Sequence, residues 1–224
     1  MAQEGNRDMD SLNHAQILQI ALKGSRTMSG LTLLQVVFLF LALYYILGLI
    51  PHIYLTRSLF FYAHADWQKC EHAAAKVRRW PWSAIPPNEW IRGRGKLVPP
   101  RSMATALMGI ALFKQGRIAE SYPYLSSTVI QDLSNFDEAL LADLHLSAGI
   151  AALSLGYYEE ACVYLRRAAK VHPVKAQAWY HLGEALYSLH NGEAAQSVWR
   201  AVIKEGKEPW STHAKKRLRE MQKQ

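Results

Sequence analysis

The chain has 224 residues, half of them apolar, and a net charge of +8. A chain of this length can hold one folded body together with an anchor, and its apolar content is sufficient for a sizeable core. The basic excess is concentrated in two stretches: residues 51–101 carry nine Lys and Arg against three Asp and Glu, and residues 210–224 carry five against one. A nucleic-acid-binding protein would spread its basic residues over the binding face, so we expect no nucleic acid among the partners.

Residues 1–30 are a polar leader with one short amphipathic pattern. Ile17, Leu18 and Leu22 would share one face of a helix. The pattern is compatible with a helix that lies on a membrane surface and equally with a loosely ordered leader.

Residues 31–50 are the most apolar stretch of the chain. A helix of this length, at about 1.5 Å per residue, is about 30 Å long and matches the hydrocarbon core of a bilayer. The stretch predicts a transmembrane helix and hence a single-pass membrane protein. A cleavable signal peptide is the alternative, although its apolar region would be shorter and nearer the start. Pro51 either ends the helix or kinks one that continues.

Cations close to the predicted span bear on its orientation. Lys23 and Arg26 precede it, and Arg57 follows it. Because the counts are nearly balanced, they leave the side of the membrane undetermined. We slightly favour a cytoplasmic side for the residues after the span, because their basic and Trp-rich loop would meet anionic lipid there.

Two copies of one 34-residue pattern occupy the stretch from Ala142 to Pro209. The second copy contains Trp179, Leu182, Gly183, Leu186, Ala195, Trp199 and Pro209. The first has, at the matching offsets, Gly149, Gly156, Tyr158, Ala161, Leu165, Ala168 and Pro173. This pattern resembles the tetratricopeptide-repeat (TPR) family. The resemblance implies an all-α solenoid of helical hairpins that binds other proteins along a curved face, and it implies no catalytic chemistry.

Five positions of the pattern predict how the helices pack. Small residues at Gly149, Gly183 and Ala161 would let the two helices of a hairpin approach closely. Leu165 and Trp199 would fill the space between neighbouring hairpins.

The resemblance extends toward the N-terminus. Residues 102–135 predict a third repeat, in which Pro123 lies inside the second helix and predicts a kink. Residues 51–82 predict a degenerate, membrane-proximal hairpin. The expected fold is therefore all-α, with a transmembrane helix, this hairpin and a TPR domain of three hairpins over residues 102–209.

A capping helix is predicted over residues 210–224, because a solenoid needs a terminal helix with a polar outer face. Ser211 is its expected N-cap.

Residues 83–101 form a loop rich in Pro, Trp and Arg, since no helix is compatible with that density of prolines. This loop and its flank combine tryptophans with cations, which suits a membrane interface. The residues concerned are Trp80, Trp82, Trp90, Arg92, Arg94 and Lys96. The alternative is that the tryptophans cover the first hairpin.

No motif indicates catalysis. The nearest candidates for metal ligands are His64, Asp66, Cys70 and His72, but Cys70 and His72 would point to opposite sides of one helix. Cys70 and Cys162 each suit a small buried position, which predicts core thiols. We therefore expect no enzymatic activity, no cofactor and no metal.

The TPR resemblance implies that the first helix of each hairpin lines the binding groove. Carried over residue by residue, the contact positions are Ala106, Ile110, Phe113, Leu146, Ile150, Leu153, Tyr180, Glu184 and Tyr187, with Lys114 and Asp143 beside them. Most of these residues are apolar or aromatic, which indicates a hydrophobic or helical segment of a partner protein as the ligand. The alternative is that the chain fills its own groove.

Together these elements predict a membrane-anchored scaffold for protein–protein interaction, which docks a partner in an apolar groove during assembly or recruitment of a membrane complex. The alternative function is an integral structural subunit of a larger membrane complex.

Overall fold

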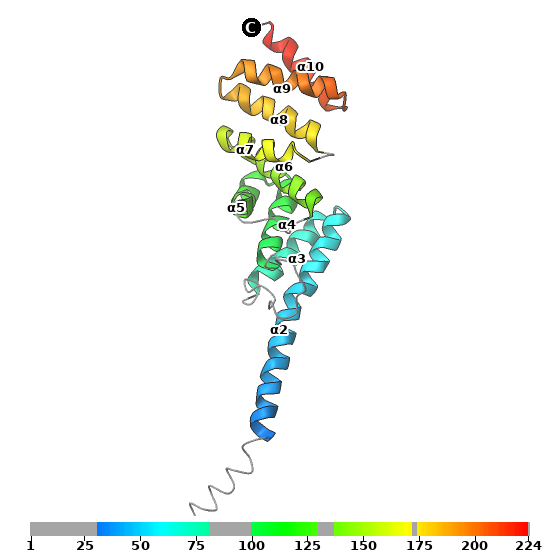
Figure 1. Cartoon of the computed structure of the whole chain (residues 1–224), viewed down its shortest axis with the longest axis vertical. Coiled ribbons are helices and arrows are strands. Elements are labelled where there is room, and N and C mark those ends of the chain that lie inside the picture. Colours follow the sequence, from blue (N-terminus) through cyan, green and yellow to red (C-terminus); the bar gives the residue numbers. More distant parts are fainter. Residues whose placement is uncertain (1–30, 81–99, 130–136, 172–173, 224) are drawn as a thin grey trace, which may run out of the picture. The chain divides into compact units, whose positions relative to one another are not determined.

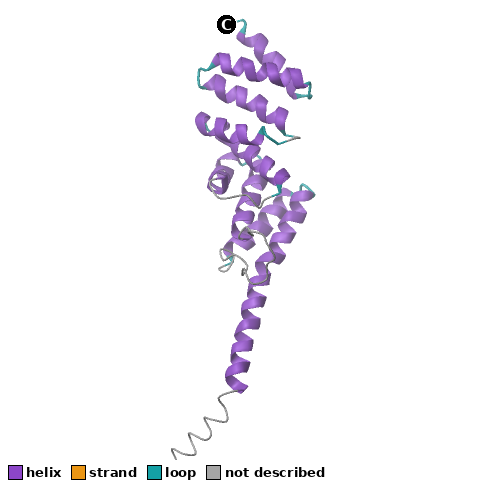
Figure 2. Cartoon of the chain, viewed as in Figure 1, coloured by secondary structure: helices purple, strands orange, loops and turns teal. Residues whose placement is uncertain are grey.

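A computed structural model of the protein describes residues 31–80, 100–129, 137–171 and 174–223. Within these ranges helices are the only regular secondary structure (Figure 2). The chain divides into two compact units, residues 1–47 and residues 48–224. The leader of residues 1–30 lies outside the described residues.

Helix α2 (Leu31–Ala63) is labelled in Figure 1. Its residues as far as Leu47 belong to the first unit, and those from Gly48 belong to the second. Pro51 lies inside it, so the helix does not end there, and it continues to Ala63. In the first unit its large apolar side chains are exposed by 48% to 74% between Val36 and Leu43. Among the described residues, no helix combines the length and the apolar character needed to cross a bilayer. The span over residues 31–50 stays a prediction.

The second unit is an all-helical solenoid, as predicted. After α2 its helices are α3 (Trp67–Arg79), α4 (Pro100–Lys114), α5 (Ile118–Val129), α6 (Glu138–Ser154), α7 (Tyr158–Ala168), α8 (Lys175–Ser188), α9 (Gly192–Glu205) and α10 (Trp210–Met221). Helices α4 and α5, α6 and α7, and α8 and α9 pack as hairpins, and each hairpin packs on the next. Helix α10 covers the last hairpin by contacting both α9 and α8.

One type of turn connects helices at four places. After α2, α4, α6 and α8, a backbone N–H donates to the carbonyl five residues earlier, with N–O distances of 2.9 to 3.0 Å. The donors are Asp66, Arg117, Tyr157 and Asn191. The residue before each donor has a positive φ, which is 54° at Ala65, 80° at Gly116, 84° at Gly156 and 59° at His190. The segment from α2 to α3 thus shares the turn of the three hairpins that follow it.

Each of the three later hairpins is closed by a glycine that meets a large side chain of the second helix. A Cβ atom added to Gly183 would lie closer than 3.0 Å to the indole of Trp199. Gly149 meets Leu165, and Gly109 meets Leu125, with the same offset in sequence. The close approach predicted at Gly149 and Gly183 is confirmed.

The partners of these glycines differ from the expectation in one respect. Leu165 and Trp199 pack on the glycine of their own hairpin, rather than only between neighbouring hairpins. The Trp199 Nε1–H also donates to the carbonyl oxygen of Tyr180 at 3.1 Å, which satisfies the buried indole within the hairpin.

The start of α10 and the course of α5 differ from, or add to, what the sequence predicts. Ser211 is not the N-cap of α10, because the helix begins at Trp210 with Pro209 as its cap, and the Ser211 side chain is buried inside the first turn. Helix α5 continues across Pro123 from Ile118 to Val129. Cys70 and Cys162 are buried free thiols, as predicted.

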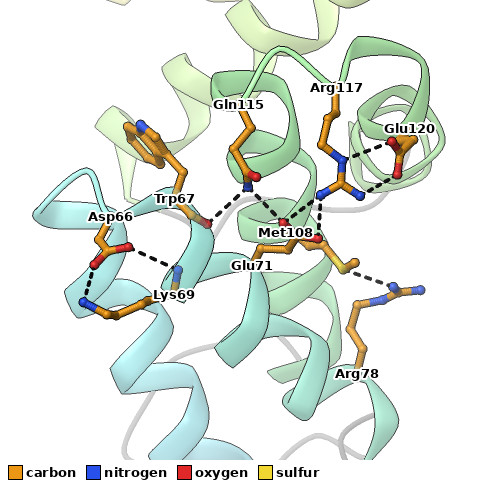
Figure 3. A network of polar contacts seen from close by, with 9 residues as sticks. All are labelled: Asp66, Trp67, Lys69, Glu71, Arg78, Met108, Gln115, Arg117 and Glu120. Carbon is orange, nitrogen blue, oxygen red and sulfur yellow. Dashed lines mark hydrogen bonds and ion pairs between the residues drawn. The ribbon is translucent and has the colours of Figure 1, made fainter.

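Polar contacts attach α3 to the hairpin of α4 and α5 (Figure 3). Glu71 accepts hydrogen bonds from Arg117 Nη1 at 3.0 Å and from Gln115 Nε2 at 2.9 Å. On the same side Arg78 donates to the sulfur of Met108 at 3.3 Å and lies over the ring of Tyr124. These contacts make α3 a stacked member of the solenoid.

The packing of Gly183 on Trp199 leads to a prediction about stability. Because the added Cβ of Gly183→Ala would collide with the buried indole, the substitution should lower the free energy of unfolding by about 1–3 kcal/mol. Chemical denaturation followed by circular dichroism measures this loss.

Gly192→Ala is the matched control, because its Cβ would meet only the flexible end of Met221 at 3.3 Å. It should leave stability unchanged or raise it slightly, since alanine favours helix. Equal effects of the two substitutions would contradict the packing role of Gly183.

Candidate partner-binding face

The first helices of the three later hairpins and the capping helix lie next to one another. Helix α4 contacts α6, α6 contacts α8, and α8 contacts α10. This row carries all the residues predicted to touch a partner, and the packing between its members decides which of them are accessible.

Three of the predicted contact residues are core residues. Ala106 and Ile110 have no exposed surface, and Leu146 is 3% exposed. The flank of a first helix packs on the neighbouring first helix, so these positions face the interior and not a partner. Their assignment to the contact surface is corrected.

The remaining apolar positions keep part of their surface accessible. Phe113 on α4, Ile150 and Leu153 on α6, and Tyr180 and Tyr187 on α8 are partly buried and pack against the core with their inner sides. We call these five residues the first-helix face. They are the apolar part of the predicted contact surface that stays accessible.

A polar cluster closes one end of the first-helix face. Lys114 Nζ lies 2.9 Å from Asp143 Oδ1, and the Tyr62 hydroxyl donates to Asp143 Oδ2 at 3.0 Å. Burial raises the pKa of Tyr62, and the neighbouring Asp143 carboxylate raises it further. Asp143 of α6 therefore binds both Lys114 of α4 and Tyr62 of α2, so these contacts link three helices at this end of the row.

The capping helix closes the other end. Arg217 donates to both carboxylate oxygens of Glu184, at 2.7 and 2.8 Å, and to Glu220 at 2.9 Å. Its guanidinium also lies 5.4 Å from the ring centre of Tyr187. The hydrogen bonds to Glu184 raise the pKa of Arg217. Glu184 is therefore engaged inside the chain, while the alternative that the chain fills its own groove stays a prediction.

An aromatic cluster lies beside this ion pair. The Tyr180 ring is 5.6 Å from the Trp210 ring, and His181 lies 5.4 Å from Trp210. A cleft of about 440 Å³ opens here, lined by residues of α8 and α10 that include Tyr180 and Arg217. Sequence reasoning missed the roles of Trp210 and Arg217, because nothing in a terminal basic helix indicates which neighbour it covers.

Most of the predicted membrane-interface residues are outside the described part of the chain. Trp80 is the C-cap residue of α3 and is partly buried. The others, which are Trp82, Trp90, Arg92, Arg94 and Lys96, lie in residues 81–99 and outside the described residues. Their role stays a prediction.

The residues considered as metal ligands do not converge. Cys70 is buried beside Ser58, His72 is exposed, and Asp66 accepts a hydrogen bond from the Lys69 backbone as the N-cap of α3. No group of three metal-ligating side chains occurs among the described residues.

The stacked hairpins define the class of protein as an α-solenoid of TPR-like repeats. The crystal structure of YrrB, described as a TPR protein with an unusual peptide-binding site, superposes with a TM-score of 0.53 at 17% identity over 74% of each chain. A structure of MamA MSR-1 superposes with a TM-score of 0.51 at 14% identity, over 76% of this chain and 87% of that one. No curated protein matches the sequence.

A family model makes the identification more specific. Residues 111–224, half of the chain, match the model described as bacterial transcriptional activator domain. The chain belongs to this family.

The aromatic cluster predicts a dependence of stability on pH. Burial lowers the pKa of His181 to about 4, with His213 contributing, whereas an unfolded histidine titrates near 6.5. The unfolded chain therefore binds more protons between these values, so stability is full above about pH 6.5 and falls as the pH is lowered toward 4. From pH 7 to pH 5 the loss at this site should be up to about 2 kcal/mol.

Denaturation of His181→Phe at the two pH values tests this prediction, because phenylalanine preserves ring packing and cannot titrate. The variant should lose a smaller part of its stability than the wild type, while His72→Gln on the exposed side of α3 should behave like the wild type. Burial also lowers the pKa of His145 to about 4 and lowers that of His52, so these two histidines contribute to the dependence that remains in the variant. Identical profiles for wild type and His181→Phe would contradict the assignment.

Proposed function

We propose that the protein is a membrane-anchored interaction scaffold whose first-helix face holds a hydrophobic or helical segment of a partner protein. The observation that carries the proposal is the arrangement of this face. Partly exposed apolar side chains at Phe113, Ile150 and Leu153 lie on α4 and α6, and intramolecular ion pairs join α4 to α6 and α8 to α10. An accessible apolar surface of this kind is typical of a protein interface.

The comparisons support protein binding by analogy of fold. YrrB is described as having a peptide-binding site, and its repeats superpose on those of this chain. The matched family is named for bacterial transcriptional activators. We propose contact with protein and not with nucleic acid, because Arg117 and Arg217 are engaged with Glu71 and Glu184 in the described repeats.

We further propose that α2 anchors the scaffold in a bilayer. Large apolar side chains are exposed along the helix from Val36 to Leu43, and Phe38 reaches 74% exposure. Water is a costly environment for a continuous apolar helix surface, so lipid or another apolar helix has to cover it. Cover by helices of other subunits corresponds to the alternative function, an integral structural subunit. A cytoplasmic side for the repeats, and a role in the assembly or recruitment of a membrane complex, are part of the proposal.

Site-specific photocrosslinking tests the partner face. A benzophenone side chain at position 153 of the full-length protein, in its native membrane, should crosslink to a discrete protein. The same probe at position 163 is the matched control, because Val163 is also apolar and is 46% exposed, but lies on α7 outside the first-helix face. Adding Ile150→Glu should reduce crosslinking from position 153 at least about tenfold, because a charge in an apolar interface is strongly unfavourable.

Unchanged helical content by circular dichroism separates loss of binding from loss of folding. Equal crosslinking from positions 153 and 163, or crosslinking that persists in the Ile150→Glu background, would refute the proposed face.

Alkaline carbonate extraction tests the anchor. The full-length protein should remain in the membrane pellet, and Val37→Lys combined with Phe40→Lys should release it, since each lysine near the centre of a span costs about 2.5–3.5 kcal/mol. Leu155→Lys combined with Val163→Lys is the control, because both residues are exposed apolar residues of the repeats. Extraction of the wild-type protein at alkaline pH would exclude an integral anchor.

A further inference from the structure

A cleft between the end of α2 and the outer side of α3 has a composition unlike that of the first-helix face. It has a volume of about 300 Å³ and lies entirely in the second unit. Helix α2 contributes Tyr54, Arg57 and Phe61, which are spaced by three and four residues and share one face of the helix. The opposite side of α3 packs into the core through Cys70, Ala74 and Val77.

The cleft is cationic. Arg57, Lys69 and Lys76 line it together with His72, and none of the described lining residues is acidic. Lys69 pairs with Asp66 at 2.7 Å. The other carboxylate of α3, Glu71, binds Arg117 and Gln115 on the side of the next hairpin. Within the part of the chain that the structure describes, the positive charges of the cleft are therefore balanced only in part.

Aromatic rings hold two of the ammonium groups at the cleft. Lys76 Nζ lies 5.3 Å from the ring centre of Tyr54, and Lys69 Nζ lies 5.7 Å from that of Phe61. Such cation–π contacts are individually weak, but they gather the cations on one side. An anion with several oxygen acceptors could then bind more than one of these donors at once.

An exposed apolar strip on α2 adjoins the cleft. Ile53 is 56% exposed and Phe60 is 57% exposed, and they lie two helical turns apart on the face that also carries Arg57. Apolar side chains next to clustered cations are typical of a surface at the headgroup level of a bilayer, where the apolar groups reach acyl chains and the cations reach phosphates.

We propose that this cleft binds the phosphate group of an anionic phospholipid. The proposal rests on the proposed anchoring of α2, which would bring the cleft close to the bilayer. Arg57, His72, Lys69 and Lys76 are the residues that would bind the phosphate oxygens. Phosphate chemistry alone would also admit free phosphate. The adjoining apolar strip favours the lipid, because a free phosphate ion has no apolar part that could contact it.

Chemical footprinting of lysines tests the site without requiring an intact bilayer. The full-length protein, purified in a neutral detergent, is acetylated in the presence of dihexanoyl-phosphatidylglycerol, dihexanoyl-phosphatidylcholine or inorganic phosphate. Phosphatidylglycerol should slow the acetylation of Lys69 and Lys76 by about threefold or more, on the scale of a headgroup–cation attraction. Lys170 and Lys207, exposed elsewhere in the same unit, should react at unchanged rates.

Arg57→Gln combined with His72→Gln should abolish this protection, because both residues line the cleft and neither is a reporter. Arg166→Gln combined with His190→Gln is the matched control, with both residues exposed and remote in sequence. Circular dichroism verifies that each variant is folded.

Equal protection by inorganic phosphate would overturn the lipid assignment, and absence of protection by any of the three ligands would overturn the site. Failure of the anchor is distinguishable, because it appears as alkaline extraction of the wild-type protein and leaves the detergent experiment unaffected.

Discussion

The solenoid depends on one close approach, which is repeated in three hairpins. A glycine on the first helix leaves room for a leucine or tryptophan of the second helix, and the two positions keep the same separation at Gly109, Gly149 and Gly183. Because a single Cβ atom would collide with the opposing side chain, the spacing between the paired helices is fixed by the absence of that atom. The accessible face follows from this spacing, since it determines how the first helices align.

Much of this arrangement could be predicted from the sequence, because the packing glycines and their large partners are local features with a fixed separation. The accessible surface, in contrast, could not be predicted from the sequence. Ile110 and Leu146 have the hydrophobicity of contact residues, and only the packing of α4 against α6 places them in the core. The pairing of Arg217 with Glu184 was equally hidden, since it joins residues 33 positions apart whose charges resemble those of any exposed helix.

The first-helix face is apolar, and ion pairs link the helices of its row at two places. The pairs Lys114–Asp143 and Arg217–Glu184 contribute little stability as partly exposed salt bridges. Their effect is on alignment, because each joins helices of different hairpins or of a hairpin and its cap. An apolar segment bound as we propose would meet fixed charges as well as apolar side chains, which favours one register over others.

The four helix-connecting turns share one backbone geometry but not one residue. Glycine occupies the left-handed position in two of them, whereas Ala65 and His190 occupy it at a small conformational cost. The same backbone hydrogen bond therefore forms without the residue that suits it best. Further copies of this hairpin should accordingly be recognised more reliably by the geometry of their loops than by a glycine in their sequence.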